Sequence, residues 1–546
     1  MSQENKIKVH VAISRALLDA GVDQLFGLVG DANMYVVDSY LRDGRGRYVA
    51  AVHEAGAVLM ALGYAQLLGR VGVATVTQGP GLTNCLTALV EGVKCALPVL
   101  LIAGDTAVED RNHFQSVNQR EFVHATGAGF EQLRSPQTVV QDVARALYRA
   151  VVEKRPVVLN MPADYQWMET VYEKPSLRIP ETRSAIASSD DMDIAIGMIA
   201  SAKRPVVIAG RGAIDPEASR SVKEFAQRIE APVATTLRGK GLFAGDSFDL
   251  GICGTLSSEV AVEVIGASDC LIAFGASLNK YTAGLGGLTQ NKRIIQINPS
   301  ATELGKLIDI DIGLAGDPGL TAQAMTKWLD EAEIPGSGYR SDHLREKLAG
   351  FSRPTRMPRK PREGTIDMIE AMQGLNTSFP KDRVCVMDGG RFNHGAWSEI
   401  DVLHPRDFVH TIAYGAIGLG LGEAVGAAVA ANGRPTLCIV GDGGLMLSGL
   451  GELSVAVREK LDLVVVVCND GSYGAEHVHF RNRDMDPAVS LFVWPDFVPM
   501  AQALGAGGAT VRNGADLVAA FAAMSSADRV GPFLIDIKLD PDCMPS

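Results

Sequence analysis

Residues 436–472 read TLCIVGDGGLMLSGLGELSVAVREKLDLVVVVCNDGS. An apolar run with the composition of a β-strand ends at Gly441-Asp442-Gly443-Gly444, a helical stretch follows, and a second apolar run ends at Asn469-Asp470-Gly471-Ser472. Strand, helix and strand in this order predict a βαβ unit, in which the carboxyl ends of the parallel strands meet at one edge of the sheet. Both polar sequences are therefore expected at the same ligand-binding edge.

The residues expected at this edge suit a phosphate group held through a divalent cation. Glycines allow backbone N–H groups to approach an anion at a helix N-terminus. Asp442 would repel a diphosphate there unless a cation such as magnesium lay between them, and an oxygen ligand 27 or 28 residues further on, from Asn469 or Asp470, would complete the site. An ordinary glycine turn is the alternative interpretation.

The same alternation of strands and helices continues through the rest of the 546 residues. Helices are expected over residues 9–20 and 55–68, and strands over 24–28, 71–77 and 98–103. Polar, proline-bearing segments at 174–191 and 339–364 read as linkers. We therefore predict an α/β protein of three doubly wound parallel-sheet domains, with an N-terminal domain at 1–185, a central domain at 186–345 and a C-terminal domain at 360–546.

Composition excludes several classes of function. The net charge of -12 gives no general attraction for nucleic acid or for anionic lipid. No apolar stretch approaches the roughly 20 residues of a membrane span, and the polar start differs from a signal peptide, so a cytoplasmic protein is expected. The eight cysteines form no C-x-x-C pair, which favours buried thiols.

The spacing from Gly-Asp-Gly to Asn-Asp resembles the thiamine-diphosphate motif of the acetolactate synthase and 2-oxo acid decarboxylase family. The resemblance implies that magnesium takes the carboxylates of Asp442 and Asp470 and the backbone carbonyl of Ser472, although a one-residue shift makes Asn469 a rival ligand. The sequence MDGGRF at 387–392 occupies the place of the family's second diphosphate loop. The other cofactor-binding residues implied are Gly390, Gly441, Gly443, Gly444 and Tyr473.

Two further segments carry the resemblance. Glu54, in AAVHEAGAVLMALGYAQLLGR, begins an apolar, alanine-rich helix, and apolar surroundings would raise its pKa. Its implied role is to share a proton with the cofactor's aminopyrimidine, while a helix-terminal glutamate stabilised by the dipole is the alternative. Ile417, in AYGAIGLGLGEAVGAAVA, resembles the bulky residue that holds the cofactor bent, and a core isoleucine is the alternative interpretation.

Three more positions bear on the reaction. The segment FGLVGDAN at 26–33 resembles the Gly-Asp-x-Asn of decarboxylases, which makes Asp31 a candidate catalytic residue. His113 stands where decarboxylases have paired histidines, and Gln115 matches the substrate-site glutamine of acetolactate synthases. With Glu476, Asp31 and His113 would form a proton relay. A turn, a surface loop and a solvated helix residue are the alternatives for Asp31, His113 and Glu476, and His477 and His479 read as incidental.

The resemblance also bears on assembly and on a second cofactor. Glu54 and Asp442 lie in different domains, and in this family the two come from different subunits, so a homodimer or homotetramer is implied. Acetolactate synthases bind FAD in the central domain, but Ser277, Gln296 and Asn298 replace the arginine and acidic residues expected there, which makes FAD doubtful. A purine nucleotide is an alternative ligand, without the usual ribose-binding acid.

The leading hypothesis is a thiamine-diphosphate- and magnesium-dependent lyase or carboligase acting on a small 2-oxo acid. The alternatives are an enzyme like 2-hydroxyacyl-CoA lyase or oxalyl-CoA decarboxylase, a flavin oxidase of the same fold, and a non-catalytic binding or regulatory protein. The sequence does not specify the substrate side chain or the acceptor.

Overall fold

The computed structural model describes residues 6–110, 112–175, 186, 189–351, 360–526 and 528–544. Most of the first expected linker, the boundary expected at residue 185, and residues 352–359 of the second linker lie outside these ranges. The chain divides into two compact units, one made of residues 1–180, 357–396 and 409–546, and the other of residues 181–356 and 397–408. All eight cysteines are buried free thiols, as the sequence predicts.

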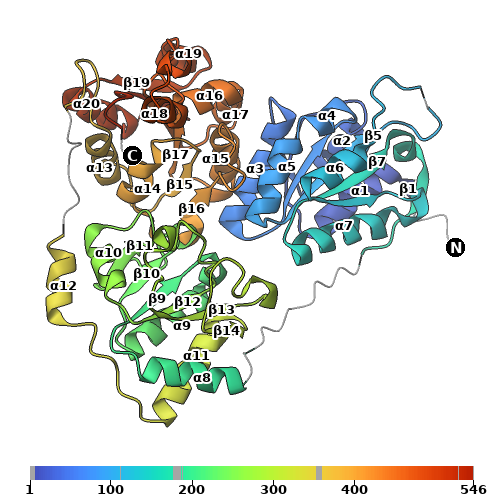
Figure 1. The fold of residues 1–546 in the computed structure, drawn as a ribbon. Helices are drawn as coiled ribbons and strands as arrows, with labels where there is room; N and C mark the ends of the chain where they lie inside the picture. The colour runs from blue at the N-terminus through green and yellow to red at the C-terminus, as the bar shows by residue number, and fades with distance from the viewer. Residues whose placement is uncertain are drawn as a thin grey trace. The chain divides into compact units, whose positions relative to one another are not determined.

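The N-terminal sheet contains six parallel strands in the order β3-β2-β4-β5-β7-β6. Figure 1 draws this domain in blue to blue-green. Along each strand, alternate side chains face opposite sides of the sheet, so that Leu25, Val73 and Leu100 join one apolar cluster while Phe26, Ala74 and Leu101 join another. Helices therefore cover both faces, α1, α2 and α7 on one and α3, α5 and α6 on the other. The strands are β2 (Gln24–Gly27), β3 (Arg47–Ala50), β4 (Gly72–Val76), β5 (Val99–Asp105), β6 (Gly129–Gln132) and β7 (Val157–Pro162).

The helices around this sheet match the predicted pattern. They are α1 (Val9–Asp19), α2 (Met34–Asp43), α3 (Glu54–Leu68), α5 (Leu86–Cys95), α6 (Gln119–Thr126) and α7 (Val139–Glu153). A short antiparallel pair, β1 (Lys6–Lys8) with β8 (Glu169–Val171), joins the two ends of the domain.

The second unit holds its own six-stranded parallel sheet, in the order β11-β10-β9-β12-β13-β14. Its strands are β9 (Pro205–Ala209), β10 (Val233–Thr235), β11 (Asp249–Ile252), β12 (Cys270–Phe274), β13 (Arg293–Asn298) and β14 (Ile312–Ala315). Residues 397–408, which the sequence analysis assigns to the C-terminal domain, belong to this unit, and Lys240 Nζ donates to the Trp397 carbonyl oxygen over 2.6 Å. The chain thus passes between the two units four times, after residues 180, 356, 396 and 408.

The C-terminal sheet has the order β16-β15-β17-β18-β20-β19. Its strands are β15 (Val384–Met387), β16 (Phe408–His410), β17 (Thr436–Gly441), β18 (Leu463–Asn469), β19 (Gly507–Val511) and β20 (Phe533–Lys538). Numbered within each domain, the N- and C-terminal sheets share the strand order 2-1-3-4-6-5. The order reverses between the first and third strands of each sheet, and the crevice at such a reversal is where open α/β sheets bind ligands.

Helices α3 and α15 (Gly420–Ala431) join the N- and C-terminal sheets within the first unit. Both helices are apolar on every side, which predicts burial on every side. Glycines allow their backbones to meet, since a Cβ on Gly426 would lie 1.9 Å from the Met60 carbonyl oxygen and one on Gly63 would lie 2.0 Å from that of Glu423.

Candidate active site

Asp442 and Asp470 form a buried carboxylate pair at the carboxyl ends of β17 and β18. Strand β17 ends at Gly441, and helix α16 (Asp442–Ser448) begins at the next residue. Burial raises the pKa of the Asp442 carboxyl, and the negative charge of Asp470 raises it further. Burial likewise raises the pKa of Asp470. Two desolvated carboxylates side by side are unfavourable unless a proton or a cation compensates them.

The oxygen atoms around this pair fit a hard divalent cation. Asp470 Oδ1 accepts hydrogen bonds from the Ser472 backbone N–H over 2.9 Å and from the Ser472 hydroxyl over 2.8 Å, which fixes the turn after β18. The Asn469 amide instead donates to Asp536 over 2.9 Å, so this side chain is engaged within the sheet. Carboxylate and carbonyl oxygens are the ligands that Mg²⁺ prefers in proteins.

Aromatic rings enclose the carboxylate pair. Trp494 Nε1 donates to Asp442 Oδ2 over 2.8 Å, and its indole stacks on Phe492 with ring centroids 4.7 Å apart. The Tyr473 ring contacts Phe492 edge to face and covers Gly443, where a Cβ would lie 2.6 Å from the ring. The predicted cofactor residues Gly443 and Tyr473 therefore lie in contact.

Asp388 anchors the segment that carries Ile417. Its buried carboxylate follows β15 and accepts hydrogen bonds from the backbone N–H groups of Gly389, Gly418 and Leu419, at 2.7 to 3.3 Å. Burial raises its pKa to about 6. A Cβ on Gly389 would lie 3.1 Å from Ile417 Cγ2, and one on Gly444 would lie 2.7 Å from Asp388 Oδ2. The Asp388 carboxylate thus anchors the backbone that follows Ile417 and lies close to Gly444 of the Gly-Asp-Gly-Gly turn.

Gly390, a predicted cofactor-binding residue, lies in the loop after β15. A Cβ on Gly390 would lie 2.4 Å from the Phe392 ring, and one on Gly441 would lie 3.2 Å from the same ring. The loop after β15 and the end of β17 therefore meet around Phe392, where a side chain on Gly390 would displace the ring and one on Gly441 would contact it tightly.

Glu54 is the first residue of helix α3, and the two residues before it, Val52 and His53, form hydrogen bonds with the C-terminal domain. Its Oε2 accepts a hydrogen bond from the Asn84 amide over 2.9 Å, and the residue is half-buried rather than enclosed by apolar side chains. The backbone N–H groups of Val52 and His53 donate to Oε1 of the buried Glu452, over 3.3 and 3.1 Å. Glu452 belongs to α17 (Gly451–Arg458), the helix that follows α16.

Asp31, Gln78 and Gln115 form one hydrogen-bonded chain at the carboxyl ends of β2, β4 and β5. Gln78 Nε2 donates to Asp31 Oδ2 over 3.3 Å and to Gln115 Oε1 over 2.7 Å. His113 Nδ1 accepts from the Gln115 backbone N–H over 3.2 Å, and its ring stacks on Phe114. The structure thus brings together three residues that the sequence analysis singles out, with Gln78 between them.

Glu476 is exposed near the start of α18 (Gly474–Asn482). Among the described residues, no hydrogen bond joins it to Asp31, Gln115 or His113. His477 is buried, with Nδ1 3.3 Å from the Ser490 hydroxyl and Nε2 3.1 Å from Asp542 Oδ1, which is a structural position. His479 is exposed on the same helix.

The crevice of the central sheet is occupied by its own backbone. Loops after β9 and β12 meet there, and a Cβ on Gly210 would lie 2.5 Å from the Gly275 carbonyl oxygen. Gln296, which replaces an acidic residue expected for FAD, donates to the Ala276 carbonyl oxygen and accepts from the Gly305 N–H. The Asn298 side chain accepts from the Ser300 N–H. These side chains are engaged in local structure.

Sequence reasoning did not assign roles to several residues that shape this site. Asp388 follows an apolar strand just as Asp442 does, so the same strand-end signal was available for it. Glu452 is an acidic residue in the first turn of α17, which is a weaker signal. Trp494 carries no sequence signal for its role, since only the fold brings it to Asp442 across 52 positions of sequence. Gln78 and Asn84 are two further residues of the site to which the sequence analysis gives no role.

Within the described residues, no helix has both the length and the apolar character needed to cross a bilayer. Three family models match the chain: the N-terminal TPP binding domain of thiamine pyrophosphate enzymes at residues 7–125, their central domain at 192–325, and their C-terminal TPP binding domain at 388–537. These matches cover the whole central sheet and most of the other two sheets, with β6, β7 and β15 lying outside the matched residues.

Similar proteins agree with these matches. The sulfoacetaldehyde acetyltransferase of Alcaligenes xylosoxydans xylosoxydans is 29% identical over 90% of this chain and 86% of that protein. The acetolactate synthase isozyme 2 large subunit of Escherichia coli is 27% identical over 97% of this chain and 95% of that subunit. An acetolactate synthase of Mycobacterium bovis is 28% identical over 93% of this chain and 84% of that protein. The chain is therefore a member of the thiamine pyrophosphate enzyme family, and a thiamine-diphosphate-dependent enzyme.

Proposed function

We propose that this protein is a magnesium- and thiamine-diphosphate-dependent lyase or carboligase that acts on a small 2-oxo acid. The observation that carries the proposal is the buried pair of Asp442 and Asp470 at the carboxyl ends of β17 and β18, beside a glycine turn that opens a helix. Such a pair suits a metal-bound diphosphate at the switch point of an α/β sheet.

Magnesium would be held by the carboxylates of Asp442 and Asp470 and by the Ser472 carbonyl. The engagement of the Asn469 amide with Asp536 supports Asp470 over Asn469 as the second ligand. Backbone N–H groups of Gly443 and Gly444, in the first turn of α16, would bind the diphosphate, with Gly390 and Gly441 leaving room beside it. Tyr473 would cover the glycine turn.

Glu54 would share a proton with the aminopyrimidine nitrogen at the other end of the cofactor. The Asn84 amide, 2.9 Å from Glu54 Oε2, would hold the carboxylate in a fixed orientation. Ile417, on the loop anchored by Asp388, would hold the two rings of the cofactor close together. Thiamine diphosphate, when bound, supplies the nucleophilic carbon and the electron sink for loss of CO₂ from a 2-oxo acid.

The chain of Asp31, Gln78 and Gln115 would line the substrate side of the cofactor. Gln78 joins a carboxylate to an amide, so that this wall can both donate to and accept from the polar groups of a 2-oxo acid. His113, held beside Gln115, and Glu476 would transfer protons to and from the substrate. The names of the similar proteins, acetolactate synthase and sulfoacetaldehyde acetyltransferase, favour transfer of the acyl fragment to an acceptor over its release as an aldehyde.

We infer that the working unit is a homodimer or homotetramer. Glu54 is only half-buried in one chain, although the proton sharing assigned to it calls for a site that excludes water. Phe114, next to Gln115, is 90% exposed, and Leu447 at the end of α16 is 64% exposed. Large apolar side chains exposed beside a site are typical of surfaces that a partner covers.

Product analysis tests the proposed reaction. The protein loaded with thiamine diphosphate and Mg²⁺ is incubated with pyruvate or benzoylformate, with and without an aldehyde, and the products are identified by mass spectrometry. We expect loss of CO₂ and, with an acceptor present, a new 2-hydroxy ketone. Failure to convert any 2-oxo acid or 2-hydroxyacyl thioester would overturn the proposal.

A further inference from the structure

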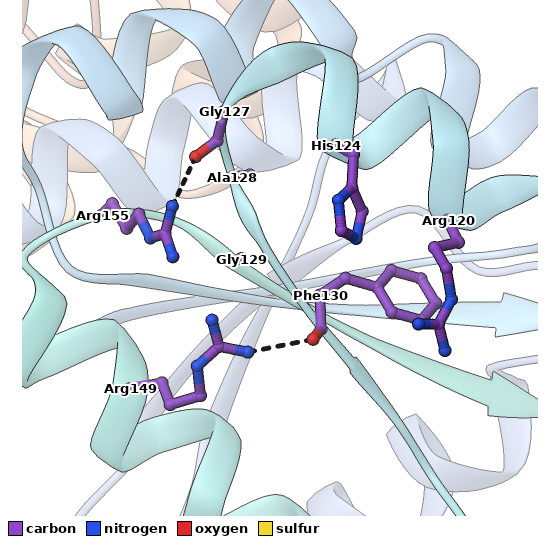
Figure 2. A pocket seen from close by; sticks show the side chains of 8 residues that line it. All are labelled: Arg120, His124, Gly127, Ala128, Gly129, Phe130, Arg149 and Arg155. Atoms are coloured by element: carbon purple, nitrogen blue, oxygen red, sulfur yellow. Dashed lines mark hydrogen bonds between the residues drawn. The ribbon is translucent and has the colours of Figure 1, made fainter.

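The N-terminal domain carries a basic hollow of about 320 Å³, away from the site described above. Arg120 and His124 on α6, Arg149 on α7, and Arg155 in the loop that follows surround a floor made of residues 127–130 (Figure 2). The hollow lies at the amino ends of β6 and β7, whereas Asp31 and Gln78 follow the carboxyl ends of β2 and β4. Because the strands are parallel, the two sites are at opposite ends of the sheet.

Two of the arginines are fixed in orientation by their neighbours. Glu153 accepts from Arg149 Nε over 2.6 Å and from Arg155 Nε over 2.7 Å, so one carboxylate links both guanidinium groups. Arg149 also donates to the Phe130 carbonyl oxygen and Arg155 to the Gly127 carbonyl oxygen, each over 3.0 Å, and Figure 2 shows both bonds. Arginine groups ordered before a ligand arrives lose less entropy on binding it.

Arg120 differs from these two arginines because its guanidinium N–H groups are not engaged by a carboxylate of the described residues. Its guanidinium carbon lies 4.7 Å from the centre of the Phe130 ring, and in the part of the chain described here it has no carboxylate partner. The ion pairs around the hollow join Arg145, Arg149 and Arg155 to only two carboxylates, those of Glu131 and Glu153. Arg145 does not line the hollow, so its lining carries three arginines, Arg120, Arg149 and Arg155, against the two carboxylates that pair with them, and the balance is one positive charge.

Three of the four floor residues, Gly127, Ala128 and Gly129, are small, which leaves room for a ligand beside the Phe130 ring. A Cβ on Gly129 would lie 2.9 Å from Val157 Cγ2 and 3.1 Å from an Arg149 nitrogen, so any larger residue would displace the arginine. Gly127 adopts a φ of +81° at the end of α6, a conformation that glycine takes without strain. The absence of a side chain at Gly129 thus leaves space for the Arg149 guanidinium group beside the floor.

We propose that this hollow binds the phosphoryl group of a small phosphate compound. Forked guanidinium donors match the tetrahedral oxygens of a phosphate better than they match a monovalent halide. The volume suits inorganic phosphate or a small organic phosphate, whose ring or chain would lie near the exposed edge of Phe130. The acidic balance of the whole chain, with a net charge of -12, disfavours a polymeric anion such as nucleic acid.

Calorimetric titration of the holoenzyme tests the proposal. Protein loaded with thiamine diphosphate and Mg²⁺ and freed of excess cofactor is titrated with inorganic phosphate and, separately, with AMP. We expect saturable binding of one molecule per chain that weakens as NaCl is raised. Tighter binding of AMP would identify an organic phosphate as the ligand, and equal binding would identify free phosphate.

Variants of one exposed arginine provide the control. Arg120→Gln is expected to weaken binding at least tenfold, and Arg120→Lys, which keeps the charge but loses the fork, is expected to weaken it less. Arg42→Gln removes a similarly exposed arginine from α2 and should leave the affinity unchanged. Binding of equal strength in Arg120→Gln, binding seen only in cofactor-free protein, or no saturable binding at millimolar concentrations would overturn the proposal.

Discussion

Asp442 has a hydrogen-bond donor, Trp494, that no sequence motif indicates. The indole N–H lies 2.8 Å from Asp442 Oδ2 and fixes the direction in which this carboxylate presents its other oxygen. Partners of this kind orient metal ligands, and their loss typically weakens metal affinity by about 10- to 100-fold. Trp494 is therefore expected to act as a positioning residue for the metal ligand.

Trp494→Phe should keep the ring stack with Phe492 and lose only the N–H donor. We expect its affinity for Mn²⁺, used as a spectroscopic substitute for Mg²⁺, to fall by about tenfold. Electron paramagnetic resonance titration of free Mn²⁺ measures this directly. Trp328→Phe in the central domain is the matched control, and equal Mn²⁺ affinity in the two variants would contradict the role of Trp494.

Glu452 gives a pH-dependent prediction. Burial raises the pKa of its carboxyl from 4.5 to about 7, against the opposing effects of the Val52 and His53 N–H groups and of the positive charge of Arg458. Between these two pH values the folded protein holds a proton that the unfolded chain has released, so this group makes the free energy of unfolding fall as pH rises.

Glu452→Gln removes that ionisation but keeps an oxygen that can accept from the two N–H groups. The free energy of unfolding of the variant minus that of the parent protein should increase by about 1 to 3 kcal/mol as the pH is raised from 5 to 8. Thermal unfolding midpoints of both proteins at the two pH values test this, with the exposed Glu173→Gln as control. A parent-to-variant difference that is the same at pH 5 and pH 8 would show that Glu452 does not titrate as expected.

The packing of α3 against α15 gives a prediction at the level of helices. A Cβ on Gly426 would lie 1.9 Å from a backbone oxygen of α3, so Gly426→Ala must force the helices apart. Overpacking of this kind costs about 1 to 3 kcal/mol or more, despite the higher helix propensity of alanine. Gly197→Ala in α8 (Ser189–Ala200), where a Cβ would meet nothing within 4 Å, is the control and should stabilise the protein slightly. Differential scanning calorimetry compares the two, and an unchanged Gly426→Ala midpoint would show that the helices do not meet this closely.

At this level the sequence predicted most of the fold. Apolar runs and helical periodicity located β2, β4, β5, α1 and α3 because burial of one face determines those patterns. Residues 397–408 fall within the predicted C-terminal domain but belong to the central unit, because tertiary contacts and no local sequence pattern join them to it. The hydrogen bonds that join Asp31, Gln78 and Gln115 could be predicted only in part. Asp31 and Gln115 were singled out from the sequence, but the contact between the two glutamines depends on how three strand ends are spaced.

For the whole molecule, the proposed assembly predicts complementation. Glu54→Gln and Asp442→Asn should each be inactive, because each removes one end of the site. If the two residues of one site come from different subunits, unfolding and refolding the mixed variants yields mixed dimers with one intact site, and activity should return to roughly a quarter of the parent value. No recovery from mixtures that do form mixed dimers would place both residues of a site in one chain.

The central claim is that Glu54 and Asp442 hold opposite ends of one thiamine diphosphate. Proton NMR of the loss of the cofactor's thiazolium C2 hydrogen in D₂O, combined with calorimetric binding, tests it most directly. The account predicts Mg²⁺-dependent binding and rapid exchange in the parent protein, binding without rapid exchange in Glu54→Gln, and weak or no binding in Asp442→Asn. Rapid exchange in Glu54→Gln, or undiminished cofactor binding in Asp442→Asn, would contradict it.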